Sequence, residues 1–485
     1  MIFKRKLYDK LLVWKQQTAG TKALLIEGAR RIGKSTLVEE FAKNEYRSYL
    51  MIDFNKVSDS VISAFNNYMN DLDTFFLILS SEYGVRLYPK ESIIIFDEIQ
   101  QFPKARQAIK YLVADGRFDY IETGSLISIK ENVNDITIPS EERTLLMYPM
   151  DFEEFAWAMN EEPLMAYIRQ CFDKKVPLEQ GIHAKAMLLF RQYMIVGGMP
   201  KSLSAYLENN RNFEMADMEK RDILTLYRND IKKIKSGYRS SVLSIFDQIP
   251  AFLSRSERRV VMNRIEKGAS FPKYHDTFFW LSDSMIANEC FNCSDPNVGL
   301  SLNEDRTYVK CYMGDTGLLI SHTFDENEIS DGELYREILL GKLSVNEGMF
   351  YENVIAQMLV AAGHKLYFYT RYNQEKHRND MEIDFILSNH SKLRYKIFPI
   401  EVKSNDKYSI IALLPRVNTA MSAVNHHCFL CKINLYSCIF TFCVCITIYI
   451  FTCPDSLPRI FHQSWQCNTC CCIHRRQCHY AHCCN

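Results

Sequence analysis

The stretch Lys22-Ala-Leu-Leu-Ile-Glu-Gly28-Ala-Arg-Arg-Ile-Gly33-Lys34-Ser35 decides the fold of the N-terminal part of this sequence. A short apolar run stops at Gly28, and apolar residues at helical spacing follow Ser35, so we expect a strand, a tight loop and a helix. The loop matches G-x-x-x-x-G-K-[ST] at every fixed position. Glycines there let backbone N–H groups turn toward a phosphate, and the helix N-terminus adds positive potential. The stretch therefore predicts a phosphate-binding loop.

The expected cofactors of this loop are ATP and Mg²⁺. Lys34 would bridge the β- and γ-phosphates, and the hydroxyl of Ser35 would bind Mg²⁺. The alternative is a glycine-rich turn with an exposed lysine. The residues expected to line the nucleotide are Gly28, Ala29, Arg30, Arg31, Ile32, Gly33, Lys34, Ser35 and Thr36.

A second motif follows about sixty residues later, where the apolar run 92–96 ends in Asp97 and Glu98. At the end of a buried strand, an aspartate can hold Mg²⁺ and an adjacent glutamate can polarise the attacking water. We therefore predict Asp97 as a metal ligand and Glu98 as the catalytic base. Two solvated charges at a strand end are the alternative.

Two further catalytic candidates are weaker. Thr123 or Ser125, at the end of the next expected strand, can place a polar group between the γ-phosphate and the water, although a simple Thr-Gly-Ser turn explains them equally well. Arg143 can approach a phosphate in its own chain or in a neighbouring subunit, because a guanidinium suits a developing phosphoryl charge. A solvated surface arginine is the alternative reading of Arg143.

The order of apolar runs predicts an α/β fold. Strands are expected at 22–28, 48–53, 92–97 and 118–123, separated by helical stretches, which favours a parallel sheet covered on both faces. The pattern turns helical after residue 150, and a possible hairpin through 288–292 and 306–312 suggests a winged helix. A helix containing 350–359 then leads into strands at 365–370, 381–387 and 397–402. We expect five segments along the chain. They are an α/β domain at 1–150, a helical subdomain at 151–235, a winged-helix-like segment at 236–330, a second α/β unit at 331–410 and a cysteine-rich segment at 411–485.

Seven ordered motifs resemble a family of bacterial and archaeal AAA-type ATPases with a C-terminal domain of unassigned function. They are the phosphate-binding loop, Phe96-Asp-Glu-Ile-Gln, Thr123-Gly-Ser, Tyr148-Pro-Met-Asp-Phe-Glu-Glu-Phe, Val196-Gly-Gly-Met-Pro200, Tyr312-Met-Gly-Asp-Thr-Gly-Leu-Leu319 and Glu401-Val-Lys403-Ser. The resemblance covers residues 1 to about 410. It implies an ATPase core, a helical lid, a winged-helix-like segment and a restriction-endonuclease-like C-terminal fold.

The C-terminal motif also has a reading of its own. Asp384 and the pair Glu401 and Lys403 lie on neighbouring expected strands and fit the D…ExK pattern of metal-dependent nucleases. The carboxylates would hold Mg²⁺ and the lysine would orient water. If the strands pair with Asp384 opposite Glu401, both carboxylates can bind one ion. Glu352 on the preceding helix matches the extra acidic residue of such folds. The alternative is a degenerate fold kept for DNA contact or packing.

Charge and cysteine content limit the partners. The 485 residues carry 58 Lys and Arg against 58 Asp and Glu, so no overall field attracts nucleic acid or a membrane. A local basic stretch, 255–273, can meet DNA or be a solvated helix face. DNA, protein and a second copy of the chain all stay open as partners, and no membrane is expected. We expect a cytoplasmic location, because the N-terminus has no signal-peptide pattern.

Cysteines divide the chain into two parts. Four of the 17, at 171, 290, 293 and 311, are expected to be free and apolar, and the other thirteen lie after residue 427. In this last part, the uncharged run 433–454 is long enough to span a bilayer, and two C-x-x-C pairs imitate zinc spacing. Because the segment lacks periodicity and begins where the family pattern ends, it most resembles out-of-frame translation.

Overall fold

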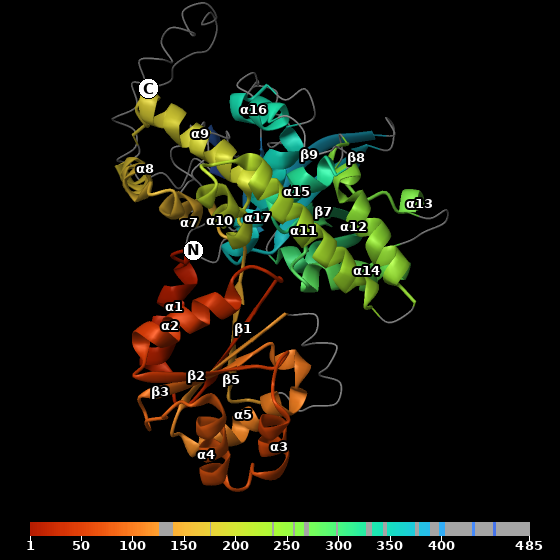
Figure 1. The fold of residues 1–485 in the computed structure, drawn as a ribbon. Coiled ribbons are helices and arrows are strands. Elements are labelled where there is room, and N and C mark those ends of the chain that lie inside the picture. The colour runs from red at the N-terminus through yellow and green to blue at the C-terminus, as the bar shows by residue number, and fades with distance from the viewer. Residues whose placement is uncertain are drawn as a thin grey trace, which may run out of the picture.

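The computed structural model describes residues 1–125, 139–174, 176–234, 237–255, 258–265, 271–296, 299–325, 332–342, 347–373, 378–388, 397–402, 429–431 and 450–452. Figure 1 shows an N-terminal unit coloured red to orange and a larger remainder coloured yellow to blue. Each unit is built around its own sheet of five strands.

The first sheet has the strand order β2-β3-β4-β1-β5, and all its described pairs are parallel. Buried runs such as Ile93–Phe96 form its centre, as expected for strands covered on both faces. The strands are β1 (Ala23–Gly28), β2 (Ser48–Asp53), β3 (Ser92–Asp97), β4 (Asp119–Gly124) and β5 (Glu142–Met147). The predicted parallel sheet is therefore confirmed, and β5 is an additional edge strand.

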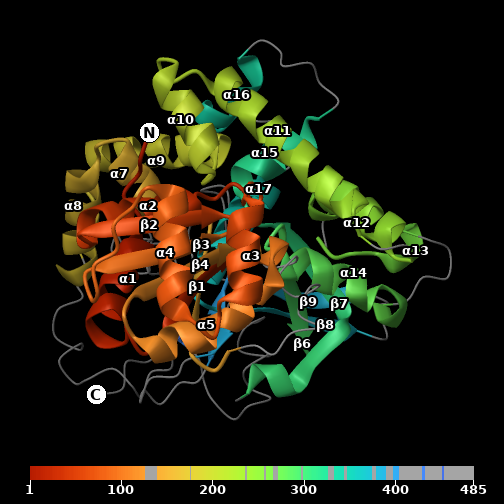
Figure 2. The same ribbon diagram turned by 60° about the horizontal axis from the view of Figure 1, so that its bottom comes forward.

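Helices cover both faces of this sheet, giving three layers (Figure 2). Leu11 and Phe41 pack with Ile26 on one face, and Phe65 and Leu112 belong to the core of the other face. The helices are α1 (Lys6–Gln17) and α2 (Lys34–Glu45) on the first face, and α3 (Asp59–Asn67), α4 (Leu72–Tyr83) and α5 (Pro103–Asp115) on the second, with the short helix η1 (Ile99–Gln101) after β3.

A group of helices follows β5, as the sequence predicts. It contains α7 (Phe152–Ala158), α8 (Glu162–Lys174), α9 (Gln180–Val196), α10 (Pro200–Glu208), α11 (Phe213–Lys232), α12 (Arg239–Leu253), α13 (Met262–Ile265) and α14 (Phe271–Asp283). The 20-residue helix α11 runs along this group, and Asp230 near its C-terminus contacts Arg30 in the loop after β1.

The second sheet is mixed and has the order β10-β9-β8-β6-β7. Its strands are β6 (Ala287–Cys293), β7 (Glu304–Met313), β8 (Leu366–Asn373), β9 (Arg378–Ser388) and β10 (Ile397–Ile400). The other elements here are η3 (Leu300–Asn303), α15 (Thr316–Thr323), α16 (Glu333–Leu340) and α17 (Gly348–Ala361).

The winged-helix expectation needs correction. The hairpin of β6 and β7 exists, but β6 also pairs in parallel with β8, with Phe291 opposite Tyr367. The hairpin is therefore part of the same sheet as the later strands, and the expected boundary at 330 falls between strands of one sheet. The sequence prediction differs from the structure because β6 pairs in parallel with β8. A local sequence pattern does not indicate a partner strand so far along the chain.

Cys171, Cys290, Cys293 and Cys311 are free and buried, as predicted. Of the segment 411–485, the description covers only the antiparallel pair β11 (Phe429–Cys431) and β12 (Ile450–Thr452). Most of the uncharged run 433–454 and most of the cysteines with zinc-like spacing lie outside the described residues. No helix within the described part of the chain is long and apolar enough to cross a membrane.

Candidate nucleotide-binding site

The phosphate-binding loop is a sharp turn between β1 and α2. Arg31 and Gly33 both have left-handed backbone angles, with φ of 69° and 90°. A Cβ at Gly33 would be strained by this angle, which favours glycine. Gly28 is needed for a different reason, because a Cβ there would lie 2.4 Å from the carbonyl oxygen of Met147 on β5. The turn is therefore shaped both by its own glycines and by the edge strand beside it.

Lys34 opens α2 and turns back over the loop. Its Nζ donates hydrogen bonds to the carbonyl oxygens of Gly28, at 3.0 Å, and of Ala29, at 2.9 Å. Burial lowers the pKa of Lys34 to about 8, although Glu98 and Asp97 act in the opposite direction. An anion beside Nζ would restore the charge that burial disfavours. The lysine thus lies where a phosphate would exchange for backbone carbonyls.

Three oxygen-bearing side chains meet beside Lys34. The hydroxyl of Ser35 donates to Oδ1 of Asp97 at 2.7 Å, and the hydroxyl of Thr123 donates to the same oxygen. Asp97 and Thr123 come from the C-terminal ends of β3 and β4, which are neighbouring parallel strands. A serine hydroxyl and a carboxylate are oxygen ligands of the type that Mg²⁺ takes together with phosphates and water. The donor set therefore fits Mg²⁺.

Glu98 follows Asp97 in a left-handed conformation, with φ of 55°. Its carboxylate accepts a hydrogen bond from the side-chain amide of Gln100. A non-glycine residue in this region stores strain, which is found at functional positions more often than elsewhere. Glu98 and Ser125 both border a cavity of about 160 Å³, so the carboxylate faces space in which a water can sit. Tyr227 and Asp230 of α11 and Trp280 of α14 also line this cavity.

A larger cavity, of about 350 Å³, also borders the loop. Gly33, Thr36 and Leu37 contribute from the loop and α2, and Pro200 contributes from the start of α10. The first residues of the chain, with Tyr8 of α1, complete its wall. This cavity has the size and the mixed lining of a small-molecule site.

Not every predicted residue faces these cavities. Ala29 and Ile32 are buried apolar side chains, so only their backbone can meet a phosphate. Arg143 is exposed on β5, opposite Leu24, four residues before Met147. At 3.3 Å per residue it lies about 13 Å from the strand end that carries the loop. The expectation that Arg143 reaches a phosphate of its own chain is therefore corrected.

Sequence reasoning missed several residues that hold the loop. Buried Arg5 donates to the carbonyls of Ile32, at 3.0 Å, and Tyr148, at 2.6 Å, and pairs with Glu154 at 3.1 Å. Asp151 and Glu154 form the capping box of α7. The motif 148–155 thus anchors the N-terminal arginine behind the loop. The Asp-x-x-Glu spacing of this motif predicts an N-terminal cap for the helix. No local pattern indicates that Arg5, far away in the sequence, contacts it.

The two glycine motifs also meet each other. A Cβ on Gly317 would lie 2.5 Å from Cα of Gly197, and one on Gly198 would lie 2.2 Å from the carbonyl oxygen of Met150. Asp315 accepts a hydrogen bond from the backbone N–H of Gly198 at 2.6 Å. These motifs therefore join the end of the first sheet, α9 and α15 through close backbone packing.

The C-terminal acidic residues have partners of their own. Glu352 is fully buried and pairs with Lys310 at 3.2 Å, while Tyr312 and Arg258 also contact its carboxylate. Lys310 in turn pairs with Glu382 at 2.7 Å. Within the described residues, no group of three or more His, Cys, Asp or Glu is arranged to hold a metal. Glu352 is thus neutralised by cationic side chains from β7 and the segment before α13.

The pairing of β9 with β10 bears on the predicted pair Asp384 and Glu401. Phe385 pairs with Ile400, so continuing this antiparallel register sets Asp384 opposite Glu401. The backbone N–H of Val402 donates to Asp384 at 2.7 Å. Lys403, the expected water-orienting residue, lies outside the described residues.

Family models match three parts of the chain. Residues 20–156 match the AAA domain, residues 187–328 match the domain of unknown function DUF8612, and residues 347–415 match the domain of unknown function DUF4143. The first part is thus an AAA domain that carries the phosphate-binding loop, and the two others have no assigned activity. No curated protein matches the sequence.

Solved structures give only distant likenesses. The ORC1 protein of Aeropyrum pernix in complex with DNA is 9% identical and covers 67% of this chain and 93% of its own, with a TM-score of 0.25. AMPPCP-bound DnaA of Aquifex aeolicus is 10% identical, with coverages of 58% and 90% and a TM-score of 0.28. The RuvB branch migration motor of Thermotoga maritima is 12% identical, with coverages of 59% and 89% and a TM-score of 0.25.

Proposed function

We propose that this chain binds MgATP at the C-terminal edge of the first sheet and hydrolyses it, using the energy to act on DNA or on another protein. The observation that carries the proposal is the meeting of Lys34, Ser35, Asp97 and Glu98 at one edge of a parallel sheet. The match of residues 20–156 to the AAA domain supports it independently.

Each residue has a distinct role in this proposal. The backbone of the loop and the ammonium of Lys34 hold the phosphates, because Lys34 already lies among carbonyls that an anion can replace. Ser35 and Asp97 would hold the magnesium ion, which supplies charge neutralisation when bound. Glu98 accepts a proton from water in the adjoining cavity, and Thr123 fixes the orientation of Asp97. The cavity bordered by Thr36 and Pro200 suits the nucleoside.

The experiment compares Lys34→Ala with Glu98→Gln in the full chain. Lys34→Ala should abolish ATP binding, whereas Glu98→Gln should bind ATP and hydrolyse it at least ~100-fold more slowly, because only the second keeps the phosphate site intact. The exposed residues Lys10 and Glu82, changed in the same way, serve as matched controls. Normal turnover by Glu98→Gln would overturn the assignment of the base.

A nucleotide-dependent switch with little turnover is the main alternative, and the same assay separates the two. A switch binds ATP but hydrolyses it no faster than Glu98→Gln does. Measurements with and without DNA address the target. Of the basic stretch, Arg258 is engaged by Glu352, and Arg259 lies over the ring of Tyr308 at 5.1 Å, so these two support a structural role better than a DNA contact.

A metal-dependent nuclease in the C-terminal unit is a second candidate function. The register that brings Asp384 and Glu401 together favours it, with Lys403 as the expected third member of the site. Because Glu352 is paired with Lys310, we expect the metal site to contain Asp384 and Glu401 but not Glu352, and so to be smaller than the sequence predicts. In this case ATP binding would gate cleavage of DNA.

A further inference from the structure

Helix α11 contacts the phosphate-binding loop at two points, although about 200 residues of chain separate them. One guanidinium nitrogen of Arg30 lies 2.8 Å and 2.9 Å from the two carboxylate oxygens of Asp230. The hydroxyl of buried Tyr227 donates to the backbone carbonyl of Arg30 at 3.3 Å. The last two turns of α11 therefore hold both the side chain and the backbone of one loop residue.

This contact borders the space where catalysis is proposed. Arg30, Tyr227 and Asp230 line the cavity of about 160 Å³ that Glu98 also lines. Arg30 is two residues after Gly28, so its guanidinium can reach either Asp230 or a phosphate held by the loop. The side chain of Arg30 is 44% exposed and that of Asp230 is 22% exposed, which leaves the pair free to separate.

A bound nucleotide changes the charge balance of this pair. A triphosphate brings several negative charges beside Arg30, and a guanidinium binds phosphate as readily as carboxylate. The same charges disfavour a carboxylate at the position of Asp230. Lys233 neutralises Asp230 only in part, from 3.0 Å with a side chain that is 71% exposed. The terminal phosphate thus competes with Asp230 for Arg30.

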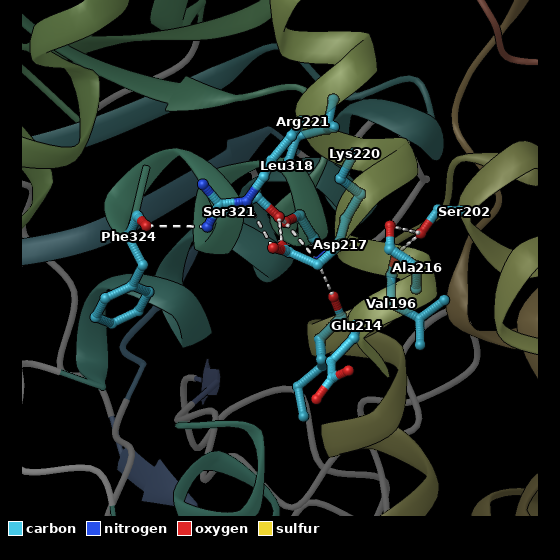
Figure 3. A network of polar contacts seen from close by, with 12 residues as sticks. Val196, Ser202, Glu214, Ala216, Asp217, Lys220, Arg221, Leu318, Ser321 and Phe324 are labelled. Atoms are coloured by element: carbon cyan, nitrogen blue, oxygen red, sulfur yellow. Dashed lines mark hydrogen bonds and ion pairs between the residues drawn. The ribbon is translucent and has the colours of Figure 1, made fainter. Parts of the chain in front are cut away.

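The other half of α11 is fastened to α15 by buried polar contacts (Figure 3). Lys220 is fully buried and donates to the carbonyls of Ile195, at 2.6 Å, and Gly317, at 3.4 Å. Arg221 pairs with Asp217 at 2.7 Å and donates to the carbonyl of Phe324 at 3.1 Å. From Asp217 to Asp230 the helix spans about 20 Å at 1.5 Å per residue. A movement of the C-terminal end of α11 would therefore be transmitted along the helix to its contacts with α15.

We propose that Asp230 is a positioning residue that senses the nucleotide: Arg30 binds Asp230 in the empty site and exchanges it for the terminal phosphate of ATP, which releases the end of α11. The inference rests on the proposed function, because it needs ATP at the loop. It adds the route by which nucleotide state reaches the second sheet, through α11 and α15. Hydrolysis and phosphate release restore the ion pair.

The test is Asp230→Asn in the full chain, with Asp222→Asn on the same helix as the matched control. Asp222 is exposed and receives the same chemical change. Because the ion pair stabilises only the empty state, its removal should tighten MgATP binding by about two- to five-fold, as for an exposed pair. Asp222→Asn should leave the affinity unchanged.

Amide hydrogen exchange distinguishes a sensing role of Asp230 from a purely structural one, because only a sensing role changes how the exchange rate responds to ATP. In the wild-type chain, ATP should increase exchange in α15, residues 316–323, and at the end of α11. In Asp230→Asn, exchange there should be raised before ATP is added, and ATP should change it little.

Two results would overturn the inference. One is an unchanged ATP affinity in Asp230→Asn, and the other is an exchange response of α15 to ATP that equals that of the wild type. Failure of the wild-type chain to bind ATP at all would instead overturn the proposed function. A lower melting temperature of Asp230→Asn with unchanged affinity and exchange response would assign the pair to stability alone.

Discussion

Raising the pH should weaken ATP binding through the proton on Lys34. Burial lowers the pKa of this ammonium to about 8 in the empty site, so it loses its proton in a range where free lysine stays charged. A bound phosphate stabilises the charged form and returns the pKa toward its usual ~10.4. Binding therefore takes up a proton wherever the empty site is deprotonated, and the affinity falls as pH rises.

The size of the effect follows from these two pKa values. Proton uptake on binding should be about 0.1 per site at pH 7, about 0.5 at pH 8 and about 0.9 at pH 9. Relative to pH 7, the affinity for MgATP should fall about two-fold at pH 8 and about ten-fold at pH 9. Between pH 9 and pH 10 the affinity should fall about a further seven-fold, and above the bound-state pKa of ~10.4 it should level off at a total loss of roughly 200-fold relative to pH 7.

Isothermal titration calorimetry of the wild-type chain with a non-hydrolysable ATP analogue measures both quantities, because it avoids turnover and keeps Glu98, whose charge raises the pKa of Lys34. Titrations in buffers of different ionisation enthalpy give the proton uptake directly. Lys34→Arg keeps its charge through this range, so whatever affinity it retains should not vary with pH. The control substitution Lys10→Arg, at an exposed residue, should leave the dependence of ATP affinity on pH unchanged. A proton uptake below about 0.2 at pH 9 would refute the argument, because it would mean that Lys34 is charged in the empty site.

The remaining predictions concern two places. One is the close backbone packing at Gly198, which joins the two units, and the other is the candidate nuclease site in the C-terminal unit. Gly198→Ala should lower the free energy of unfolding in urea by about 3 kcal/mol, because its Cβ would meet the backbone of Met150, whereas Gly84→Ala, with open space around it, should cost only about 1 kcal/mol. Equal costs would show that the joint can relax. If the C-terminal unit is a nuclease, DNA cleavage should need Mg²⁺ or Mn²⁺ and should disappear in Asp384→Ala while ATPase activity persists. No cleavage by the wild-type chain with ATP present would leave this unit a binding or packing domain.

Local sequence predicted the first sheet, and it singled out Ser35, Asp97 and Thr123, which meet at the C-terminal edge of that sheet. The runs that end in Gly28 and Asp97 carry both the strand signal and the functional residues, so fold and site could be inferred together. The edge strand β5 was missed because its outer side chains are exposed, as at Arg143 and Leu146, and its pattern is not that of a buried strand. Placing Arg143 required knowing that β5 exists.

Contacts between distant segments could not be predicted. Arg30 with Asp230 and Arg5 with Ile32 are ordinary charged or backbone groups, and only the folded chain brings them together. The motif glycines at 197 and 317 were recognisable, but their purpose, a close approach of two backbones, depends on both partners. The neutralisation of Glu352 by Lys310 is of the same kind.

The parallel pairing of β6 with β8 has a consequence for synthesis of the chain on the ribosome. The hairpin of β6 and β7 is complete at Met313, but β8 ends only at Asn373. At 5–20 residues per second, β6 waits roughly 3–12 s for its neighbour. During that interval one edge of a nascent hairpin, including the backbone of Phe291, has no strand beside it. Slower translation after Met313 would lengthen this exposure and favour aggregation, and a chaperone that binds nascent chains would act on this interval.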